Sequence, residues 1–468
     1  MKRHVVCPPL ALVMTFVPTR PVLAQARASR QSVALAFLLS VGCAPLPRTS
    51  PVSAAASLAS THVVGAYTFP PEYAHQDAIW LGWSEEQRHH PVQVEMIRAL
   101  LPHVAVRVMV RSDSARAEAT RMLAAAGIDT ARVGFVEHPL TTNWIRDSGP
   151  RFVSDGRRLA VADFAWNGYG YPAEIRATFG SEVLGRGAID NDIAARMKLP
   201  VVSTSIVAEG GALDVSRDVM IAYRQTAMER NPGVPIAEIE REYLRLYGKQ
   251  KIVWLTRAPL SDRVFSGPKI ANYFGWGANG HVDEFVRFVN DSTVAIAQVD
   301  SADAATNPLS AADRVILREN LAELRAAVNV DGRPFHIVTL PVPGIQHYMW
   351  TGPLSEDDKR ADSLGAWYRG TAVGDTIHWV PAVSYLNFVI TNGVVLAASY
   401  WHEGLPESER QKDQRVRATL ERLFPDRQIV QIDPLAFNWS GGGMHCSTQQ
   451  QPSVERSRLS RSAVHPPD

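Results

Sequence analysis

The side chains with the clearest chemical potential are one thiol, one imidazole and three carboxylates: Cys446, His281, Asp283, Asp147 and Glu209. A thiolate is a strong nucleophile, an imidazole transfers protons near neutral pH, and carboxylates bind cations. Three anionic groups around a thiol suit a cationic, planar group with many hydrogen-bond donors, which describes a guanidinium. The carboxylates would hold its N–H groups and make its central carbon more electrophilic.

Cys446 follows a glycine-rich stretch, Gly441-Gly442-Gly443-Met444-His445. Glycines permit close approaches that side chains would prevent, and we expect Gly443 among the substrate contacts. A lone cysteine is more often a buried structural residue. The polar, glycine-rich surroundings favour a nucleophile here.

His281 and Asp283 stand two residues apart in Gly280-His281-Val282-Asp283-Glu284. On a strand, which we predict here, both side chains face the same side. The carboxylate would then raise the pKa of the imidazole and keep it ready to donate a proton. A surface pair and a metal site are the alternatives, but no Cys-x-x-Cys or His-Glu-x-x-His spacing supports a metal.

Asp147 and Glu209 each stand just ahead of a predicted hairpin, in Trp144-Ile-Arg-Asp-Ser-Gly-Pro150 and Glu209-Gly-Gly211. Either acid-then-glycine pattern alone would indicate a turn. Their matching places in successive units predict that they meet at one site. We expect Asn387 and Trp144 to contact the substrate there.

The elements that must position these residues repeat one order: a hairpin, a helix and a further strand. Turn signals predict hairpins at 151–164, 212–223, 281–299 and 385–398. The predicted helices lie near 187–198, 236–247, 315–328 (Val315, Leu317, Leu321, Leu324, Val328) and 409–424. The closing strands are predicted at 201–207, 252–255, 335–340 and 428–432, and a fragmentary fifth unit covers 79–110.

Repetition of the same hairpin, helix and strand along the chain favours a closed ring or a solenoid over a doubly wound sheet. A ring would collect residues from several units at its axis. An insertion at 344–381 lengthens the last interval and contains Trp367 and Tyr368. A loop that covers the substrate and a surface elaboration are both compatible with it.

Composition excludes several other classes of protein. The chain has 468 residues, a net charge of +1, 46% hydrophobic residues and three cysteines. These values do not fit a disordered chain or a disulfide scaffold, and they give no general attraction to nucleic acid. No later segment has the length of a transmembrane helix.

The N-terminal stretch has the character of an export signal. It contains basic residues but no acid before Glu72, and Arg27 and Arg30 precede an apolar run at 33–39. Cys43 follows Leu39-Ser-Val-Gly42, an imperfect lipobox, so both a lipoprotein and a cleaved signal are open. We predict a leader and linker at 1–60, a catalytic domain at 61–452 and a disordered tail at 453–468. A mis-assigned start would instead leave a cytoplasmic protein.

Four motifs carry a family resemblance: Trp-x-Arg-Asp-x-Gly-Pro at 144–150, Glu-Gly-Gly at 209–211, Gly-His-Val-Asp-Glu at 280–284 and Gly-Gly-Gly-Met-His-Cys-Ser-Thr-Gln-Gln at 441–450. Together they resemble the agmatine deiminase family, which also contains the Porphyromonas-type peptidylarginine deiminases. The resemblance covers nearly all of 65–452. It implies an α/β fold, the pentein propeller of five pseudo-symmetric ββαβ blades.

The resemblance also implies a mechanism. Cys446 would attack the guanidino carbon, and His281 would protonate the departing ammonia and then activate water. Asp147 and Asp283 would bind the guanidinium, while Glu209 would orient His281 or share that contact. No metal or organic cofactor is needed.

Three functions remain open from the sequence. The leading hypothesis is hydrolysis of agmatine or a related small guanidino compound to a ureido product, which for agmatine is N-carbamoylputrescine. Its rivals are an exported deiminase of arginine in peptides and an exported binding protein for cationic amines. The peptidylarginine enzymes hold a substrate carboxylate with an arginine pair, and the corresponding stretch at 165–171 has no arginine. A homo-oligomer is compatible with the sequence, which does not fix the oligomeric state.

Overall fold

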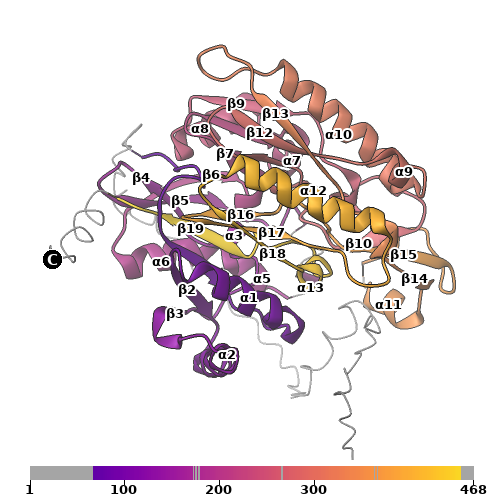
Figure 1. Cartoon of the computed structure of the whole chain (residues 1–468), viewed down its shortest axis with the longest axis horizontal. Helices are drawn as coiled ribbons and strands as arrows, with labels where there is room; N and C mark the ends of the chain where they lie inside the picture. Colours follow the sequence, from indigo (N-terminus) through magenta and orange to yellow (C-terminus); the bar gives the residue numbers. More distant parts are fainter. Residues whose placement is uncertain are drawn as a thin grey trace, which may run out of the picture.

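The structure is a computed structural model that describes residues 67–454 apart from 172, 174, 175, 178, 179, 265, 266, 363 and 366. It is an α/β protein in which short sheets alternate with helices along the chain (Figure 1). The predicted leader, with Cys43, and most of the predicted tail lie outside the described residues. No helix in the described part of the chain is long and apolar enough to cross a membrane.

The four predicted units are confirmed. Each has an antiparallel hairpin whose second strand pairs in parallel with the strand after the helix. The first two units are β4 (Arg151–Ser154), β5 (Leu159–Ala165), α6 (Ile189–Met197) and β6 (Val201–Val207), then β7 (Leu213–Val215), β8 (Val219–Tyr223), α8 (Ile236–Tyr247) and β9 (Lys251–Leu255). The next two are β11 (Val286–Phe288), β12 (Thr293–Gln298), α10 (Pro308–Ala326) and β13 (His336–Pro341), then β16 (Val389–Thr391), β17 (Val394–Ala398), α12 (Glu407–Leu423) and β18 (Gln428–Ile432).

The fragmentary fifth unit is completed by the far end of the chain. Strand β1 (Gln76–Gly82) pairs in parallel with β2 (Ala105–Val110) and antiparallel with β19 (Thr448–Pro452). Figure 1 shows this yellow strand among the indigo and purple elements. Helix α1 (His90–Leu100) links β1 and β2, and α2 (Asp113–Ala125) leads to β3 (Val133–Glu137), which the sequence did not predict.

Helix α10 illustrates how local sequence sets these elements. Asn307 accepts a hydrogen bond from the Ser310 backbone N–H, and Pro308 occupies the first turn, where its missing N–H costs nothing. Leu317 and Leu324 are buried against the sheet side, as predicted. Val315 is 53% exposed and Val328 lies beyond the end of the helix, so the places of both in the predicted apolar stripe are wrong.

The insertion at 344–381 forms a sheet of its own with an earlier strand. Its strands β14 (Trp350–Pro353) and β15 (Thr376–Val380) pair antiparallel, and β15 pairs in parallel with β10 (Tyr273–Gly275). Helix α11 (Glu356–Ala361) lies between them in the chain. The remaining short helices include α3 (Ile145–Ser148), α5 (Glu182–Gly185), α7 (Arg224–Arg230), α9 (Ser301–Ala304) and α13 (Leu435–Asn438).

The sheets remain separate in their hydrogen bonding. Across the described residues there are one four-stranded and five three-stranded sheets, and none of them closes on itself. The strands β16, β17, β12 and β1 supply much of the largest apolar core. The closed five-bladed ring therefore stays a prediction.

Candidate active site

The residues singled out from the sequence occupy equivalent places in the successive units. Asp147 in α3 precedes β4, and Glu209 precedes a 3-10 turn (Gly210–Ala212) that leads into β7. His281 precedes a 3-10 turn (Val282–Glu284) ahead of β11. Asn387 and Cys446 stand just before β16 and β19. The structure therefore brings one candidate from each unit toward a common region.

One local prediction is wrong. His281 and Asp283 do not lie on a strand, because a 3-10 turn begins directly after His281. The turn is held by Asp262, whose carboxylate accepts backbone hydrogen bonds from Gly280 at 2.6 Å and His281 at 2.8 Å. Gly280 has a φ of 97°, which a residue with a side chain rarely adopts. The two side chains still converge, but the turn and not a strand face causes it.

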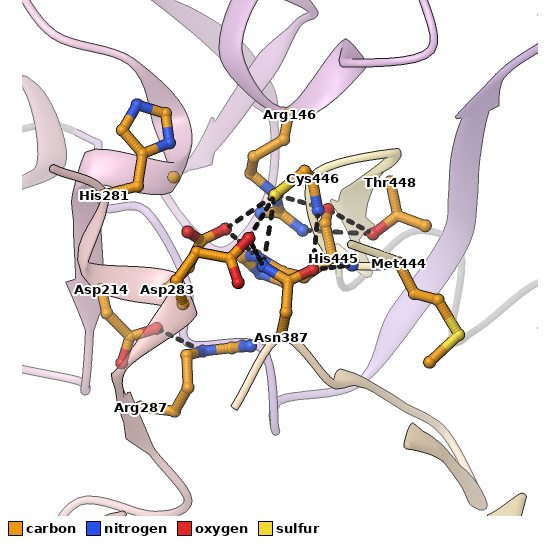
Figure 2. Close-up of polar contacts among 12 residues, drawn as sticks. Arg146, Asp214, His281, Asp283, Arg287, Asn387, Met444, His445, Cys446 and Thr448 are labelled. Carbon is orange, nitrogen blue, oxygen red and sulfur yellow. Dashed lines mark hydrogen bonds and ion pairs between the residues drawn. The ribbon is translucent and has the colours of Figure 1, made fainter. Parts of the chain in front are cut away.

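The thiol of Cys446 is buried among polar side chains. Its Sγ lies 3.2 Å from Asn387 Nδ2, 3.4 Å from Glu284 Oε1 and 3.6 Å from Asp283 Oδ2. The residue is 2% exposed, and it is the one cysteine within the described part of the chain. Figure 2 shows this set of contacts around the sulfur, and none of the contacts drawn there reaches His281.

Burial and the neighbouring carboxylates keep this thiol protonated. Loss of solvent raises the pKa of Cys446 well above its usual range, and the charges of Asp283 and Asp147 raise it further. Burial and the charge of Asp283 likewise raise the pKa of Glu284 far above that of an ordinary carboxyl group. A cation bound beside the thiol and these carboxyl groups would lower the pKa of Cys446.

His281 lies between two carboxylates. Its Nδ1 is 3.7 Å from Asp147 Oδ1, and its Nε2 is 3.6 Å from Glu209 Oε2. Burial alone would lower the pKa of His281, but the charges of Asp147 and Glu209 outweigh it and raise the pKa to about 9. The imidazole is therefore charged at neutral pH and able to donate a proton.

Glu209 and Asp147 are each held by a hydrogen bond from another side chain. Arg230 Nε donates to Glu209 Oε1 at 2.8 Å, and this cation offsets the burial of Glu209 and lowers its pKa to about 2. The Tyr169 hydroxyl donates to Asp147 Oδ2 at 2.9 Å. Burial, with the nearby charges of Asp283 and Glu209, raises the pKa of Asp147.

Gly211 makes the close approach of these groups possible. A Cβ atom at this position would lie 2.6 Å from His281 Nδ1 and 2.9 Å from Asp283 Oδ2, both closer than real Cβ contacts. The Gly211 backbone N–H donates to Asp147 Oδ1 at 3.1 Å. The second glycine of Glu-Gly-Gly therefore fills the space between the imidazole and two carboxylates.

Several buried polar atoms in this site lack a hydrogen-bond partner among the described residues. Both ring nitrogens of His281, Asp283 Oδ1 and Glu209 Oε2 form no hydrogen bond to any described residue. Buried polar atoms are nearly always hydrogen-bonded in native proteins, so a polar ligand or water is expected here. Asp283, Glu284 and Cys446 also place one ligand atom each within 4.8 Å of one another. A metal would require the last two to release protons that they hold tightly, whereas a guanidinium brings its own charge and donors.

A cavity of about 450 Å³ leads to the thiol. Cys446 and Asp147 line it together with Trp144, Trp276 and Trp367. Trp367 comes from the insertion, which therefore contributes to the wall of the cavity. Aromatic faces next to a carboxylate suit a cationic group on an alkyl chain.

The three residues expected to contact the substrate separate into two groups. Trp144 lines the cavity. Asn387 and Gly443 do not, because Asn387 faces the sulfur and a Cβ at Gly443 would lie 2.5 Å from Asn387 Oδ1. Their observed contacts position Cys446: Asn387 Oδ1 accepts the His445 backbone N–H at 2.8 Å, just before the cysteine.

Comparison with known proteins decides the family. The sequence pattern of the Porphyromonas-type peptidyl-arginine deiminases matches residues 68–452. The chain belongs to this family. A Streptomyces coelicolor protein provisionally named agmatine deiminase is 29% identical over 82% of this chain and 99% of its own length. The agmatine deiminase of Pseudomonas aeruginosa is 24% identical over 85% of this chain and 98% of its own length.

Solved structures of this deiminase family share the fold. An agmatine deiminase of Enterococcus faecalis superimposes with a TM-score of 0.61 at 20% identity, covering 83% of this chain and 96% of that one. A substrate-bound agmatine deiminase variant of C. jejuni gives a TM-score of 0.59 at 20% identity, covering 83% and 97%. The resemblance inferred from the four motifs is confirmed at the level of family and fold.

Sequence reasoning missed a buried ionic network behind the deiminase site. Its centre is Glu72, whose Oε1 lies 2.5 Å from His445 Nε2 and whose Oε2 accepts from Arg287 at 2.5 Å. Arg146 NH1 lies 3.1 Å from Glu72 Oε1 (Figure 2 labels Arg146, Arg287 and His445 of this network). His445 and Arg146 stand beside Cys446 and Asp147 in the family motifs, which was the one available signal. Nothing near Glu72 in the sequence marks it.

Arg146 joins two of the motifs directly. Its backbone N–H donates to the Cys446 carbonyl at 3.1 Å, and its Nε donates to the His445 carbonyl at 3.3 Å. The turn that carries Asp147 is thereby fastened to the turn that carries the thiol. In this deiminase the arginine of Trp-x-Arg-Asp therefore supports the cysteine and does not point to the cavity.

Proposed function

We propose that this protein is a deiminase that hydrolyses the guanidino group of agmatine or a related small guanidino compound, giving a ureido product and ammonia. The observation that carries the proposal is the group of buried atoms of His281, Asp283 and Glu209 that form no hydrogen bond with a described residue, in the same site as a buried thiol. The family membership and the agmatine deiminases among its relatives support it. With agmatine, the product is N-carbamoylputrescine, which is one step toward putrescine.

Asp147 and Asp283 bind the guanidinium in this proposal. Asp283 Oδ1 is buried without a partner, whereas its Oδ2 is already held by His445 Nδ1 at 2.6 Å. Burial would raise the pKa of Asp283, but the hydrogen bond and charge of His445 outweigh it and lower the pKa. Asp283 is therefore an anion with one free oxygen for a substrate N–H group.

The bound cation activates the thiol. Because neighbouring carboxylates raise the pKa of Cys446, the positive charge of a guanidinium beside them lowers it again. The thiol releases its proton to solvent in the cavity, and the resulting thiolate attacks the central carbon and forms a C–S bond. His281 protonates one terminal nitrogen, the C–N bond breaks, and ammonia leaves an amidino thioether on Cys446.

Water completes the reaction. The neutral His281 left by the first step accepts a proton from water, which attacks the same carbon. The C–S bond breaks, the sulfur regains a proton, and the ureido product leaves. Glu209 holds the orientation and charge of His281 throughout, because its second oxygen is fixed by Arg230.

We also propose two further properties. The five units form the closed ring of the pentein fold, supported by the pairing of β19 with β1, which joins the two ends of the described chain. An experimental structure in which the units do not close would contradict this. The protein is exported, supported by the basic and apolar leader before residue 60. Mass spectrometry of the mature N-terminus tests export and shows whether Cys43 carries lipid.

One experiment tests the reaction. The full chain is incubated with agmatine, arginine and arginine-containing peptides, and ammonia and ureido product are measured beside Cys446→Ala. We expect turnover of a guanidino compound that Cys446→Ala abolishes. No turnover, or turnover that survives this substitution, contradicts the proposal and favours a binding protein. Turnover of peptides alone favours a peptidylarginine deiminase.

A further inference from the structure

A buried histidine that the proposed reaction does not use lies beside the start of the glycine segment at 441–443. His89 ends a short 3-10 helix that precedes α1, and it is 1% exposed. Its Nδ1 lies 2.7 Å from Ser84 Oγ, and its Nε2 lies 2.9 Å from Ser440 Oγ. The ring therefore links the segment after β1 to the residue that directly precedes the glycine segment.

The hydroxyl group of Ser440 is fully used by its neighbours. Arg88 NH2 lies 2.7 Å from its Oγ and can only donate, whereas the carboxylate oxygens of Glu86 lie 3.2 and 3.1 Å away and can only accept. A hydroxyl has one proton and two lone pairs. All three are used when Ser440 donates to Glu86 and accepts from Arg88 and from the ring of His89. Ser440 lines the cavity, but in this arrangement it has no hydrogen left for a substrate.

This arrangement also decides which nitrogen of the imidazole carries the proton. Burial lowers the pKa of His89 to about 4 against the opposing charge of Glu86, so the ring is neutral near pH 7 and has one N–H. When Nε2 donates to Ser440, Nδ1 is left to accept from the Ser84 hydroxyl. Ser84 Oγ accepts in turn from the Glu86 backbone N–H at 3.0 Å. Both ring nitrogens then have a partner of the right kind.

The glycine segment lies directly against the thiol. A Cβ atom on Gly442 would lie 3.2 Å from Cys446 Sγ and 2.9 Å from the ring of Trp144. Burial raises the pKa of Cys446, and a backbone hydrogen bond from Gly443 partly offsets this rise. A shift of the glycine segment would therefore move the sulfur and weaken a contact that stabilises its thiolate.

We propose, resting on the deiminase function above, that His89 is a positioning residue that acts through Ser440 to hold the glycine segment and hence the thiol of Cys446. His89 does not line the cavity, so its effect on the reaction is indirect. Glycines restrict the backbone very little, so contacts from other segments must fix the path of the chain here. The hydrogen bond to Ser440 is such a contact.

Packing of the ring is a second way in which His89 could support the site. Its centroid lies 5.0 Å from that of Phe437 and 6.3 Å from that of Trp144, which lines the cavity. A test must therefore remove the ring in every variant and change only the position of the hydrogen-bonding group. Gln places its amide near the position of Nε2, which faces Ser440, and Asn places its amide near the position of Nδ1, which faces Ser84.

The two amide variants test the proposal in the full chain. Both kcat and KM are measured for agmatine and arginine with wild type, His89→Gln and His89→Asn. We expect His89→Asn to lower kcat about tenfold or more, because the thiol is displaced, with KM changed less than about threefold. His89→Gln should keep kcat within about threefold. Equal losses of kcat in the two variants would overturn the proposal, and so would a loss confined to KM.

His90→Asn provides the matched control. His90 is also buried at the start of α1, but its Nε2 lies 2.9 Å from the Ser84 carbonyl oxygen and its ring stacks on Trp83. We expect kcat within about threefold of wild type. A loss equal to that of His89→Asn would show general disruption of this segment and overturn the proposal.

A second pair of variants applies if melting curves show that the His89 variants do not fold. Ser440→Thr keeps the hydroxyl that His89 contacts, and Ser440→Ala removes it. A kcat at least about tenfold higher for Ser440→Thr than for Ser440→Ala supports the proposal. Equal values overturn it.

Alkylation of the thiol separates this inference from the hydrolytic reaction. Chloroacetamidine has an amidinium, which resembles one end of a guanidinium, and a carbon that alkylates a thiolate as chloride leaves. Mass spectrometry gives the rate of its reaction with Cys446 in wild type and both His89 variants. Alkylation slowed about tenfold in His89→Asn but not in His89→Gln supports the positioning role even if no guanidino compound is hydrolysed. Equal rates in the three proteins overturn it even if hydrolysis is observed.

Discussion

His445 Nδ1 lies 2.6 Å from Asp283 Oδ2, and the same ring reaches Glu72 Oε1 at 2.5 Å through its other nitrogen. Both ring nitrogens therefore lie within hydrogen-bond distance of a carboxylate oxygen. The residue directly before the nucleophile therefore fixes the carboxylate that is proposed to bind the substrate. Glu72, held by Arg287 and Arg146, fixes the imidazole in turn.

Substitution of His445 should weaken substrate binding more than it slows the chemical steps. His445→Ala removes the donor to Asp283, whose pKa then rises because burial is no longer offset. We expect KM to rise about tenfold or more, and the acidic limb of the pH profile of kcat/KM to move to higher pH. His445→Asn, which keeps a donor near Asp283, should retain more affinity.

His138→Asn provides the matched control. His138 is also buried, and its Nε2 lies 3.1 Å from Asp192 Oδ2, so its ring makes this ion pair and not one with Asp283. An equal rise in KM for this variant would indicate a general loss of stability and not the positioning of Asp283.

Removal of the Glu209 charge should move the alkaline limit of activity. Burial lowers the pKa of His281, while Asp147 and Glu209 raise it to about 9, so the imidazolium acid is lost as pH rises through this value. Glu209→Gln removes one of the two charges that raise the pKa of His281. The alkaline limb of the pH profile should therefore move to lower pH by about one unit. Measurement of kcat/KM from about pH 6 to about pH 10 shows the shift. A limb that stays in place would exclude Glu209 as the partner of His281.

The neighbouring acids Asp283 and Glu284 should respond in opposite ways to amide substitution. Glu284 is protonated in the free enzyme, because burial and Asp283 raise its pKa, so Glu284→Gln preserves its charge and shape. We expect this variant to keep activity within about tenfold. Asp283→Asn removes the anion that binds the guanidinium and should lose about a hundredfold or more. Steady-state rates near neutral pH compare the two, and equal losses would contradict the assignment.

A methyl group at Gly211 should disable the site. Its carbon would lie 2.6 Å from His281 Nδ1 and must displace the imidazole or Asp283. We expect Gly211→Ala to fold but to lose about a hundredfold or more in kcat, since misplacement by about 1 Å has that effect. Gly134→Ala is the control, because its new carbon would meet nothing nearer than 3.6 Å. Circular dichroism and melting curves show whether either variant loses its fold.

Hairpins and long amphipathic helices were predictable because their signals are local. The turns before β5, β8 and β17 and the range of α8 match the predictions closely, whereas α10 begins earlier than the predicted 315–328. Strand β19 could not be assigned to the first unit, because its pairing with β1 joins the two ends of the described chain. The 3-10 turn after His281 was missed for a similar reason, since Asp262 stabilises it from another segment.

Within the site, residue type predicted the candidates but not their contacts. Cys446 was found because it is the one thiol of the predicted domain, and Asp147 and Glu209 because they precede hairpins. Asn387 was expected to contact the substrate, whereas the structure places it against the sulfur. Glu284 belongs to a recognised motif but was given no role from the sequence. Its Oε1 lies 3.4 Å from Cys446 Sγ because the segments before β11 and β19 meet in the folded chain.

The sequence by itself determined the repeated units, the glycines that allow close approach and the set of groups able to act on a guanidinium. These properties follow from local periodicity and from the chemistry of single side chains. Only the tertiary structure decided the protonation of Cys446 and His281 and which buried atoms of Asp283 and Glu209 lack a hydrogen bond. A pKa and an unused hydrogen bond depend on burial and on neighbours from distant segments, as with Glu72 and His445, which are 373 residues apart.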